Sequence, residues 1–264
     1  MIVRKRIMGM PVVLWAIGSP KAVQAIQSAI VFLHEVDQTF STFKPTSEIS
    51  RLNSGELTSE QLSQQVKDVL AECERLKQIS DGFFDAHYGR QLDPSGYVKG
   101  WAIREAAKIL ESFGIDRYLV EISGDLQAKG DGPTGDGWVI AIANPAAPGR
   151  AATFIRLHSG AVATSGIYTQ GLHIINPKTG EPVKDPLSLT VVGDDIGLVD
   201  AYATAAYCMG AQGQGLAWLK LMGFEGLQID HRGQALATDG FQSLEALANL
   251  KPGERPPHRP PAQD

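Results

Sequence analysis

Residues 118–143 read YLVEISGDLQAKGDGPTGDGWVIAIA, and this stretch decides the fold class. Its apolar pattern predicts three strands in succession, at 118–122, 126–129 and 138–143, with no helix between them. Elsewhere, strands are predicted between helices. Strands that come both in runs and between helices favour an α+β fold over a parallel α/β sheet.

The glycines of the same stretch match a nucleotide-binding pattern only formally. Residues 130–135 fit G-x-G-x-x-G, which binds a pyrophosphate only where the glycines open a helix. Here Pro133 interrupts the pattern, Asp131 and Asp136 add negative charge, and a strand follows at Trp138. We therefore predict a hairpin loop at this position.

Outward from this stretch, further elements follow from hydrophobic periodicity. The sequence predicts helices at 22–40, 61–80, 99–113, 199–209 and 214–222. It predicts further strands at 12–17, 152–157 and 188–192, and a terminal hairpin from 226–229 and 234–238. No repeat or linker separates them. The expected architecture is one domain, residues 1–250, with a mixed, largely antiparallel sheet and packed helices.

Composition excludes several classes of protein. The 264 residues carry a net charge of −5, which argues against nucleic acid or an anionic membrane as the main partner. Two cysteines, Cys73 and Cys208, exclude a disulfide framework and cysteine-rich metal sites. No window of about 20 apolar residues could span a membrane. Five prolines within residues 251–264 predict a disordered tail.

The first residues are basic, as in a signal peptide. However, Gly9, Pro11 and Gly18 break the apolar segment that follows, and no small-residue cleavage site comes after it. This segment contains no cysteine for a lipid anchor. We therefore expect a cytoplasmic protein without a membrane anchor.

Two segments could hold phosphate or metal. Residues 93–102, DPSGYVKGWA, form a glycine-containing turn that enters a helix, with Lys99 expected in the first helical turn, a setting that favours a phosphate. A capped helix start with a solvated lysine explains the same residues. Asp200 and Thr204 share one helix face and present the oxygen ligands that Mg²⁺ prefers. The alternative is an aspartate favoured by the helix dipole beside a core threonine.

Two more segments carry candidate groups. His173 begins a short apolar strand that ends in a Pro/Gly turn, and histidine is well suited to move protons near neutral pH. The alternative is a histidine with a purely structural hydrogen bond. Residues 82–85, GFFD, place two aromatic rings and a carboxylate in one turn, which could equally be a hydrophobic anchor.

In chain order these segments resemble the ApbE family of flavin transferases, the FAD:protein FMN transferases. The resemblance runs from Ile7 to about Gly210. It rests on the segments 7–10, 40–53 (FSTFKPTSEISRLN), 82–85, 93–102, 123–125 (SGD), 135–142, 163–168, 173–180 and 200–204. It implies the family fold and an enzyme that binds Mg²⁺, cleaves the pyrophosphate of FAD, attaches FMN to a threonine or serine of a target flavoprotein and releases AMP.

The resemblance also implies the site residues. Metal ligands would be Asp200, Thr204 and the carbonyl of Gly96. FAD would be held by Met8, Phe43, Phe83, Phe84, Asp85, Asp93, Lys99 and Ile174. His173 would lie beside the pyrophosphate as the catalytic residue.

The chain departs from the family pattern at several places. The segments 86–92 and 169–172 are short, Asn176 stands where aspartate is common, and Ala203 replaces a second aspartate of some members. These differences leave fewer carboxylates around the metal. Two alternatives follow from the same site: an FAD diphosphatase with water as the acceptor, and a flavin-binding protein without turnover.

Overall fold

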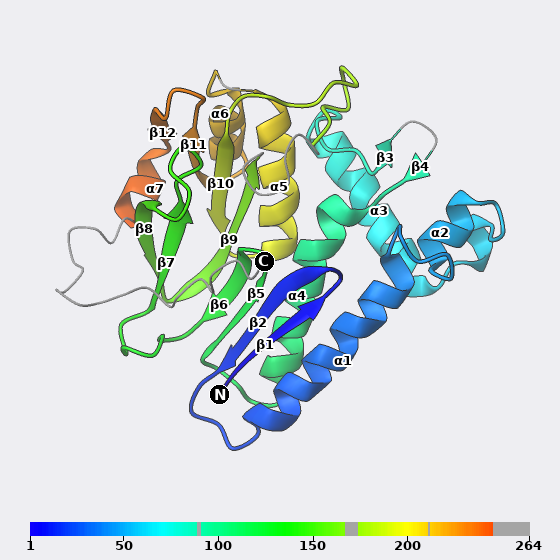
Figure 1. The fold of residues 1–264 in the computed structure, drawn as a ribbon, viewed down its shortest axis with the longest axis horizontal. Helices are drawn as coiled ribbons and strands as arrows, with labels where there is room; N and C mark the ends of the chain where they lie inside the picture. Colours follow the sequence, from blue (N-terminus) through cyan, green and yellow to red (C-terminus); the bar gives the residue numbers. More distant parts are fainter. Residues whose placement is uncertain (89–90, 167–173, 211, 245–264) are drawn as a thin grey trace.

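An eight-stranded sheet forms the centre of the molecule (Figure 1). The structure is a computed structural model that describes residues 1–88, 91–166, 174–210 and 212–244. Every neighbouring pair of strands in the sheet is antiparallel, so the predicted α+β fold is confirmed and the main sheet is fully antiparallel, where the sequence predicted a mixed, largely antiparallel one. In spatial order the strands are β1 (Ile2–Ile7), β2 (Met10–Ala16), β5 (Tyr118–Ile122), β6 (Asp125–Lys129), β9 (Ser159–Gly166), β10 (Ser188–Gly193), β11 (Glu225–Ile229) and β12 (Ala235–Ala237).

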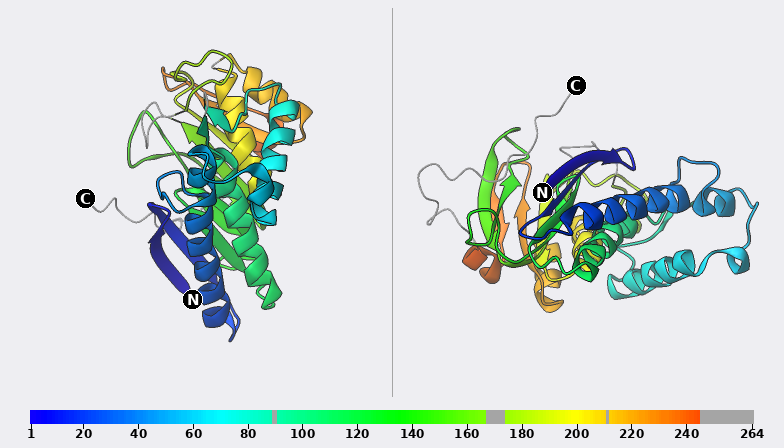
Figure 2. Two further views of the ribbon diagram at one scale, coloured as in Figure 1. Left: turned by 90° about the vertical axis from the view of Figure 1, so that its right-hand side faces the viewer. Right: turned by 90° about the horizontal axis from the view of Figure 1, so that it is seen from below.

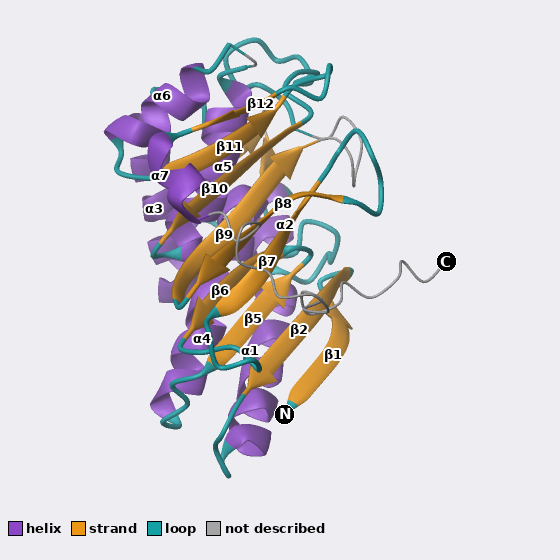
Figure 3. Ribbon diagram, turned by 90° about the vertical axis from the view of Figure 1, so that its left-hand side faces the viewer, coloured by secondary structure: helices purple, strands orange, loops and turns teal. Residues whose placement is uncertain are grey.

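Helices cover one face of this sheet (Figure 3). Strand residues such as Leu14, Val120 and Ala163 point into a large core shared with those helices. The helices are α1 (Ala22–Phe40), α3 (Gln64–Ile79), α4 (Ser95–Ser112), α5 (Ile196–Cys208) and α6 (Gln214–Leu221). Smaller elements lie near α3: α2 (Glu48–Asn53), the 3₁₀ turn Ser59–Gln61, β3 (His87–Tyr88) and β4 (Gln91–Leu92).

A separate hairpin and a short helix cover the opposite face (Figure 2). β7 (Trp138–Ala143) pairs only with β8 (Ala151–Leu157), and both pack with α7 (Asp239–Leu244) on a second core centred on Trp138 and Phe241. The three predicted strands of 118–143 are therefore present, but the third leaves the main sheet. Residues 130–137 form a loop and no helix, so no nucleotide-binding turn exists there. They do not close a hairpin, because β6 and β7 are not paired.

Most predicted elements are confirmed, with corrected bounds. Helix α1 has the predicted ends, whereas α3 begins three residues later than expected. Helix α4 begins four residues earlier, at Ser95, so Lys99 lies in its second turn and not in its first. The basic first residues form β1, which pairs with the predicted strand β2. Strand β9 was not predicted.

The remaining predictions concern the segment after His173 and the tail. Between 174 and 183, Ile175 makes only a single bridge to Pro182, so the expected strand is absent from the described part of this segment. Residues 251–264 lie outside the described residues. No described helix has the length and hydropathy required to cross a lipid bilayer.

Candidate functional site

A cluster of three charged side chains lies between the sheet and helices α4 and α5. The Lys99 ammonium on α4 makes a very close ion pair with Oδ2 of Asp125 on β6, and lies 3.2 Å from Oδ1 of Asp200 on α5. The two carboxylate side chains are each only 4% exposed, and that of Lys99 is 26% exposed. One cation and two carboxyl groups are thus held largely out of water.

The turn before β6 places Asp125 in this cluster. Ser123 and Gly124 both have positive φ, 55° and 99°, and form the two-residue turn that joins β5 to β6. Along β6, Leu126 and Ala128 point into the second core, so Asp125 points to the opposite, helix-covered face. Its second oxygen accepts a hydrogen bond of 2.9 Å from the backbone N–H of Thr164 on β9.

Gly100 allows α5 to approach α4 closely enough to join the cluster. A Cβ atom at this position would lie 2.5 Å from the carbonyl oxygen of Ile196 and 2.7 Å from Cβ of Asp200, distances that no side chain tolerates. The N–H of Gly100 donates to Asp200 Oδ2 at 2.8 Å. In a regular helix this N–H would face the carbonyl of Gly96. The sequence D-x-x-G-x-x-K-G therefore places the lysine and a close helix contact side by side.

Electrostatics keep the lysine charged. Burial alone would lower the pKa of Lys99, but the two carboxylates raise this pKa above its ordinary value. Burial raises the pKa of Asp200; Lys99 opposes this effect and the Asp125 carboxylate adds to it. The arrangement presents a permanent cation at the inner end of the site.

Hydroxyl groups continue the cluster along α5. Thr204 Oγ1 lies 3.3 Å from Ser165 Oγ on β9 and donates to the carbonyl of Asp200 at 3.3 Å. Asp200 and Thr204 share one helix face, as the sequence predicted. The described residues contain no group of three or more His, Cys, Asp or Glu side chains suited to a metal. A cation here would be held by one or two carboxylates, hydroxyl groups and a carbonyl, which are oxygen donors only.

The GFFD turn packs against the start of α4. Phe84 is buried, and a Cβ on Gly96 would lie only 3.2 Å from its ring, so the turn and the helix start are in contact. Asp85 lies 2.8 Å from Lys77 Nζ; burial opposes a low pKa, but Lys77 and the backbone N–H of His87 hold the pKa of Asp85 below its usual value. Asp93 is exposed and accepts from the backbone N–H of Ser95.

Segment 40–53 is fixed to the same region by Asn53. Its amide donates to the carbonyl of Leu92 at 2.8 Å and accepts from the backbone N–H of Leu92 at 2.8 Å. The residue before Asp93 is therefore held by both of its backbone groups. This contact gives the final asparagine of the S-E-I-x-x-L-N pattern a clear structural role.

The other predicted flavin contacts have different surroundings. Phe83 is partly buried with the Lys178 ammonium 4.2 Å from its ring centre, and Ile174 packs on the main core. Met8 is partly buried in the turn between β1 and β2. Phe43 is 93% exposed, so the structure does not bring its ring into the cluster. His173 lies outside the described residues.

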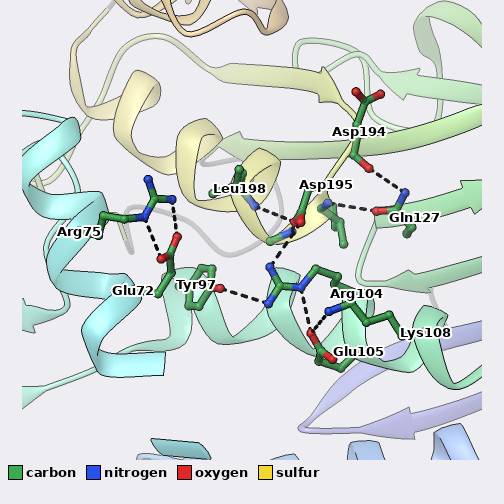
Figure 4. Close-up of polar contacts among 12 residues, drawn as sticks. Glu72, Arg75, Tyr97, Arg104, Glu105, Lys108, Gln127, Asp194, Asp195 and Leu198 are labelled. Carbon is green, nitrogen blue, oxygen red and sulfur yellow. Dashed lines mark hydrogen bonds and ion pairs between the residues drawn. The ribbon is translucent and has the colours of Figure 1, made fainter. Parts of the chain in front are cut away.

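A network of polar contacts fixes the start of α5 against α4 and β6 (Figure 4). Gln127 on β6 donates to the carbonyl of Asp194 at 3.0 Å and accepts from the N–H of Ile196 at 3.1 Å. Arg104 on α4 contacts Asp195 at 3.4 Å and the hydroxyl of Tyr97 at 3.4 Å. These contacts set the position of α5, and therefore that of Asp200.

We expect Gln127→Ala to lower the free energy of unfolding by about 1–3 kcal/mol, because it leaves the N–H of Ile196 without its partner. Urea denaturation measures this change. The control is Lys129→Ala on the same strand, which removes only the half-exposed ion pair with Glu111 and should cost about 0.5 kcal/mol. Equal losses in the two variants would contradict the role given to Gln127.

Sequence reasoning missed part of this site. Asp125 and Ser165 lie in the segments 123–125 and 163–168 that carry the family resemblance, but neither is assigned a role from the sequence, and Gln127 lies in no predicted site segment. The alternation along β6 could have revealed Asp125, because it shares the helix-covered face with Gln127 while Leu126 and Ala128 occupy the other. For Ser165 the sequence carries no such signal, since β9 consists of small residues on both faces.

Comparison with known proteins agrees with this architecture. The sequence profile of the ApbE family matches residues 8–90 and 86–227. The FAD:protein FMN transferase of Chlamydia trachomatis is 29% identical over an alignment covering 76% of this chain and 81% of the relative. The protein of that name from Vibrio cholerae is 28% identical, with 83% of this chain and 81% of the relative covered.

Solved structures show the same fold. The flavin transferase ApbE from Vibrio cholerae superposes with a TM-score of 0.82 at 26% identity, over 92% of this chain and 98% of its own. The ApbE protein of Thermotoga maritima has a TM-score of 0.82 at 21% identity, over 93% and 99% of the two chains, and supports the fold alone. The profile match covers most of the sequence, and the chain belongs to the ApbE family.

Proposed function

We propose that this chain is an FAD:protein FMN transferase. Family membership makes it a transferase that acts on flavin. The finer proposal is that it cleaves FAD, attaches FMN to a threonine or serine hydroxyl of a target flavoprotein and releases AMP. The observation that carries it is the Lys99 ammonium held between two buried carboxylates, beside the hydroxyls of Thr204 and Ser165.

The proposed reaction needs charge neutralisation more than covalent help. The acceptor oxygen attacks the phosphorus on the FMN side of the pyrophosphate, the bond to the AMP oxygen breaks, and the acceptor hydroxyl loses its proton to a base. An ammonium carries three N–H donors, of which Lys99 uses two on Asp125 and Asp200. The third can bind a phosphate oxygen and reduce the charge that opposes attack.

The donor set fits a magnesium ion. Mg²⁺ is bound in proteins by one or two carboxylates and takes further oxygens from substrate phosphates. In our proposal Asp200, Thr204 and the carbonyl of Gly96 would hold it, and Ser165 supports Thr204 at 3.3 Å. When bound, the ion would supply positive charge to the nonbridging phosphate oxygens.

The remaining predicted residues would hold FAD around this centre. Phe83 and Phe84 lie in the turn against α4, and Asp85 and Asp93 flank the same helix start. Met8, Phe43 and Ile174 complete the set that we propose. We further propose that residues 1–250 form the transferase domain, with the proline-rich 251–264 outside it. We also propose that the chain acts in the cytoplasm and does not bind nucleic acid.

We expect the chain to retain FAD in preference to FMN, because the proposed contacts include both the pyrophosphate and the adenine side of the ligand. Equilibrium dialysis against each flavin, with Mg²⁺ present, measures the preference. Equal retention of the two flavins would count against the proposed FAD site.

His173 is the proposed catalytic residue, which orients or deprotonates the acceptor hydroxyl. The His173→Gln variant keeps a hydrogen-bonding side chain but loses the basic nitrogen. We expect FMN transfer to fall by about 10² to 10⁴, the range that general-base help contributes, with FAD binding little changed. A variant that transfers FMN within a few-fold of the parent would leave a structural role for His173, and Asp125 would become the better candidate base.

The decisive experiment is the mass spectrum of a candidate flavoprotein after incubation with this chain, FAD and Mg²⁺. The expected result is a mass increase that corresponds to FMN, with AMP released. Release of FMN and AMP without a modified protein would indicate an FAD diphosphatase. FAD retention without any cleavage would indicate a flavin-binding protein without turnover.

A further inference from the structure

The outer edge of β1 carries unpaired backbone groups. The two-residue turn Met8–Gly9 makes Ile7 and Met10 a hydrogen-bonded pair, so Lys5 and Val3 also direct their backbone groups to β2. The same alternation continues to Met1 and Ala16, which exchange both bonds at 2.6 and 2.9 Å. The backbone N–H and C=O groups of Ile2, Arg4 and Arg6 therefore point away from the sheet.

No described residue takes up these outward groups. β1 is the outermost strand at this end of the sheet (Figure 3). A free edge of this kind is a template on which an extended peptide can add as a further strand.

The same edge is strongly basic. Arg4, Lys5 and Arg6 are all exposed, and none of them forms an ion pair with a described residue, although the chain as a whole carries a net charge of −5. Val3 and Ile7 point into the main core, so Arg4 and Arg6 lie on the opposite face of β1. Positive side chains and outward backbone groups thus occur at the same two residues.

The turn that ends β1 lies at the same end of the sheet as the turn that precedes Asp125. The Met8–Gly9 turn lies at the same end of the sheet as the Ser123–Gly124 turn, since the N–H of Ser123 bonds to the carbonyl of Pro11. Asp125 follows that second turn. A strand added to β1 would lie four strand intervals, about 19 Å, from β6. About six extended residues at roughly 3.3 Å each cover that distance.

We propose that the free edge of β1 docks an extended, acidic segment of the flavin-accepting protein. This inference rests on the proposed function. The added segment pairs with the backbone of Arg4 and Arg6, and its carboxylates meet their guanidinium groups. The acceptor hydroxyl then reaches the site from the Met8 end of the strand.

The sequence argues against two other occupants of this edge, which are a second copy of β1 and the C-terminal residues 245–264 of the same chain. A second copy of β1 would place arginines opposite arginines, and like charges directly opposite one another are destabilising. Residues 245–264 of this chain contain five prolines, which lack the N–H that a strand needs, and as many basic as acidic residues (three Lys and Arg, three Asp and Glu), so this segment offers no net negative charge to a basic edge.

The first test measures docking without any reaction. The probe is the peptide (Asp-Thr)₄, added to the ¹⁵N-labelled full chain, with (Lys-Thr)₄ as the control peptide. We expect amide shift changes centred on Ile2, Arg4 and Arg6 with the acidic peptide, and none there with the basic one. Absence of changes on β1 overturns the proposal, whether or not the chain transfers FMN. Self-association of Arg4→Glu without peptide binding to the parent would also overturn it, because the charges would then only prevent aggregation.

The second test uses FMN transfer to the flavoprotein identified by mass spectrometry. We expect Arg4→Glu to raise KM for that acceptor about tenfold while FAD cleavage in the absence of acceptor stays within twofold. The control, Arg232→Glu, reverses an exposed charge beside β12 at the other edge of the sheet and should leave KM unchanged. Equal effects of the two charge reversals would mean that only the overall charge of the protein affects KM, and would overturn the proposal.

A third pair of variants isolates the backbone. Both Arg4→Ala and Arg4→Pro remove the charge, but only proline removes the outward N–H, a change that an edge strand tolerates. We expect a larger KM for Arg4→Pro than for Arg4→Ala, at an unchanged thermal midpoint. Equal KM values would overturn strand addition. If the peptide shifts appear but the parent chain modifies no protein, the proposed function fails and the docking edge stands.

Discussion

Asp200→Asn should reduce FMN transfer about 10³-fold while the chain stays folded. Asparagine keeps the shape of the side chain and the acceptor for the N–H of Gly100, and Lys99 keeps Asp125 as its partner. What the variant loses is the carboxylate on the helix face shared with Thr204, the ligand on which our proposed magnesium site depends. Metal-ion charge stabilisation contributes several kcal/mol to a reaction of this kind, and each 1.4 kcal/mol corresponds to a factor of about ten.

The measurement is initial transfer rate over a magnesium titration, with circular dichroism as the check on folding. Thr204→Val is the graded comparison. It removes a neutral ligand that water can replace, so a loss of about tenfold is expected. Normal activity of Asp200→Asn at every magnesium concentration would show that the metal site is misplaced.

Lys99→Met should destabilise the chain by about 3–5 kcal/mol, because it removes the cation from two buried carboxylates and leaves them facing each other. The same variant should lose FMN transfer, since the ammonium is the one charge on α4 that we assign to the pyrophosphate. Urea denaturation followed by fluorescence and circular dichroism together gives the free energy of unfolding.

Two companion variants sharpen this prediction. Lys99→Met combined with Asp125→Asn should recover a large part of the stability but none of the transfer, because only the charge imbalance is repaired. Lys77→Met breaks a more exposed ion pair with Asp85 and should cost less than about 1 kcal/mol. If Lys99→Met and Lys77→Met cost the same, the buried cluster is not a special feature of this fold.

The sequence predicted the elements whose burial is one-sided. Helix α1 has the predicted ends because apolar residues such as Ile26, Leu33 and Val36 recur at helical spacing. Strand β9 was missed for the opposite reason: SGAVATSG is buried on both faces under two cores, so it shows neither alternation nor bulk. The start of α4 was placed too late because Gly96 and Gly100 weaken its helical pattern, and Gly100 is kept for contact with α5.

The site was predictable residue by residue but not as an assembly. The sequence singled out Lys99, Asp200 and Thr204 through local spacing. Their partner Asp125 comes from a different element, and only the pairing of β6 inside the sheet brings its carboxylate to the lysine. For Phe43 the sequence pattern alone was not enough to place the side chain. Its motif is intact, but its ring is exposed and contacts little of the described structure.

The order in which the chain forms the cluster has a consequence for its synthesis. Gly100 and Asp200 are 100 residues apart, and the main-sheet strands β9 and β10 lie between Asp125 and α5 in the chain. Closing so long a loop is slow compared with forming the local hairpins of β1–β2 and β5–β6. While the ribosome is still adding residues before α5, Lys99 and Asp125 can meet as a simple ion pair, but Asp200 does not yet exist. On the proposed function, a chain that ends before α5 therefore lacks Asp200 and cannot cleave FAD, and activity begins only when α5 docks.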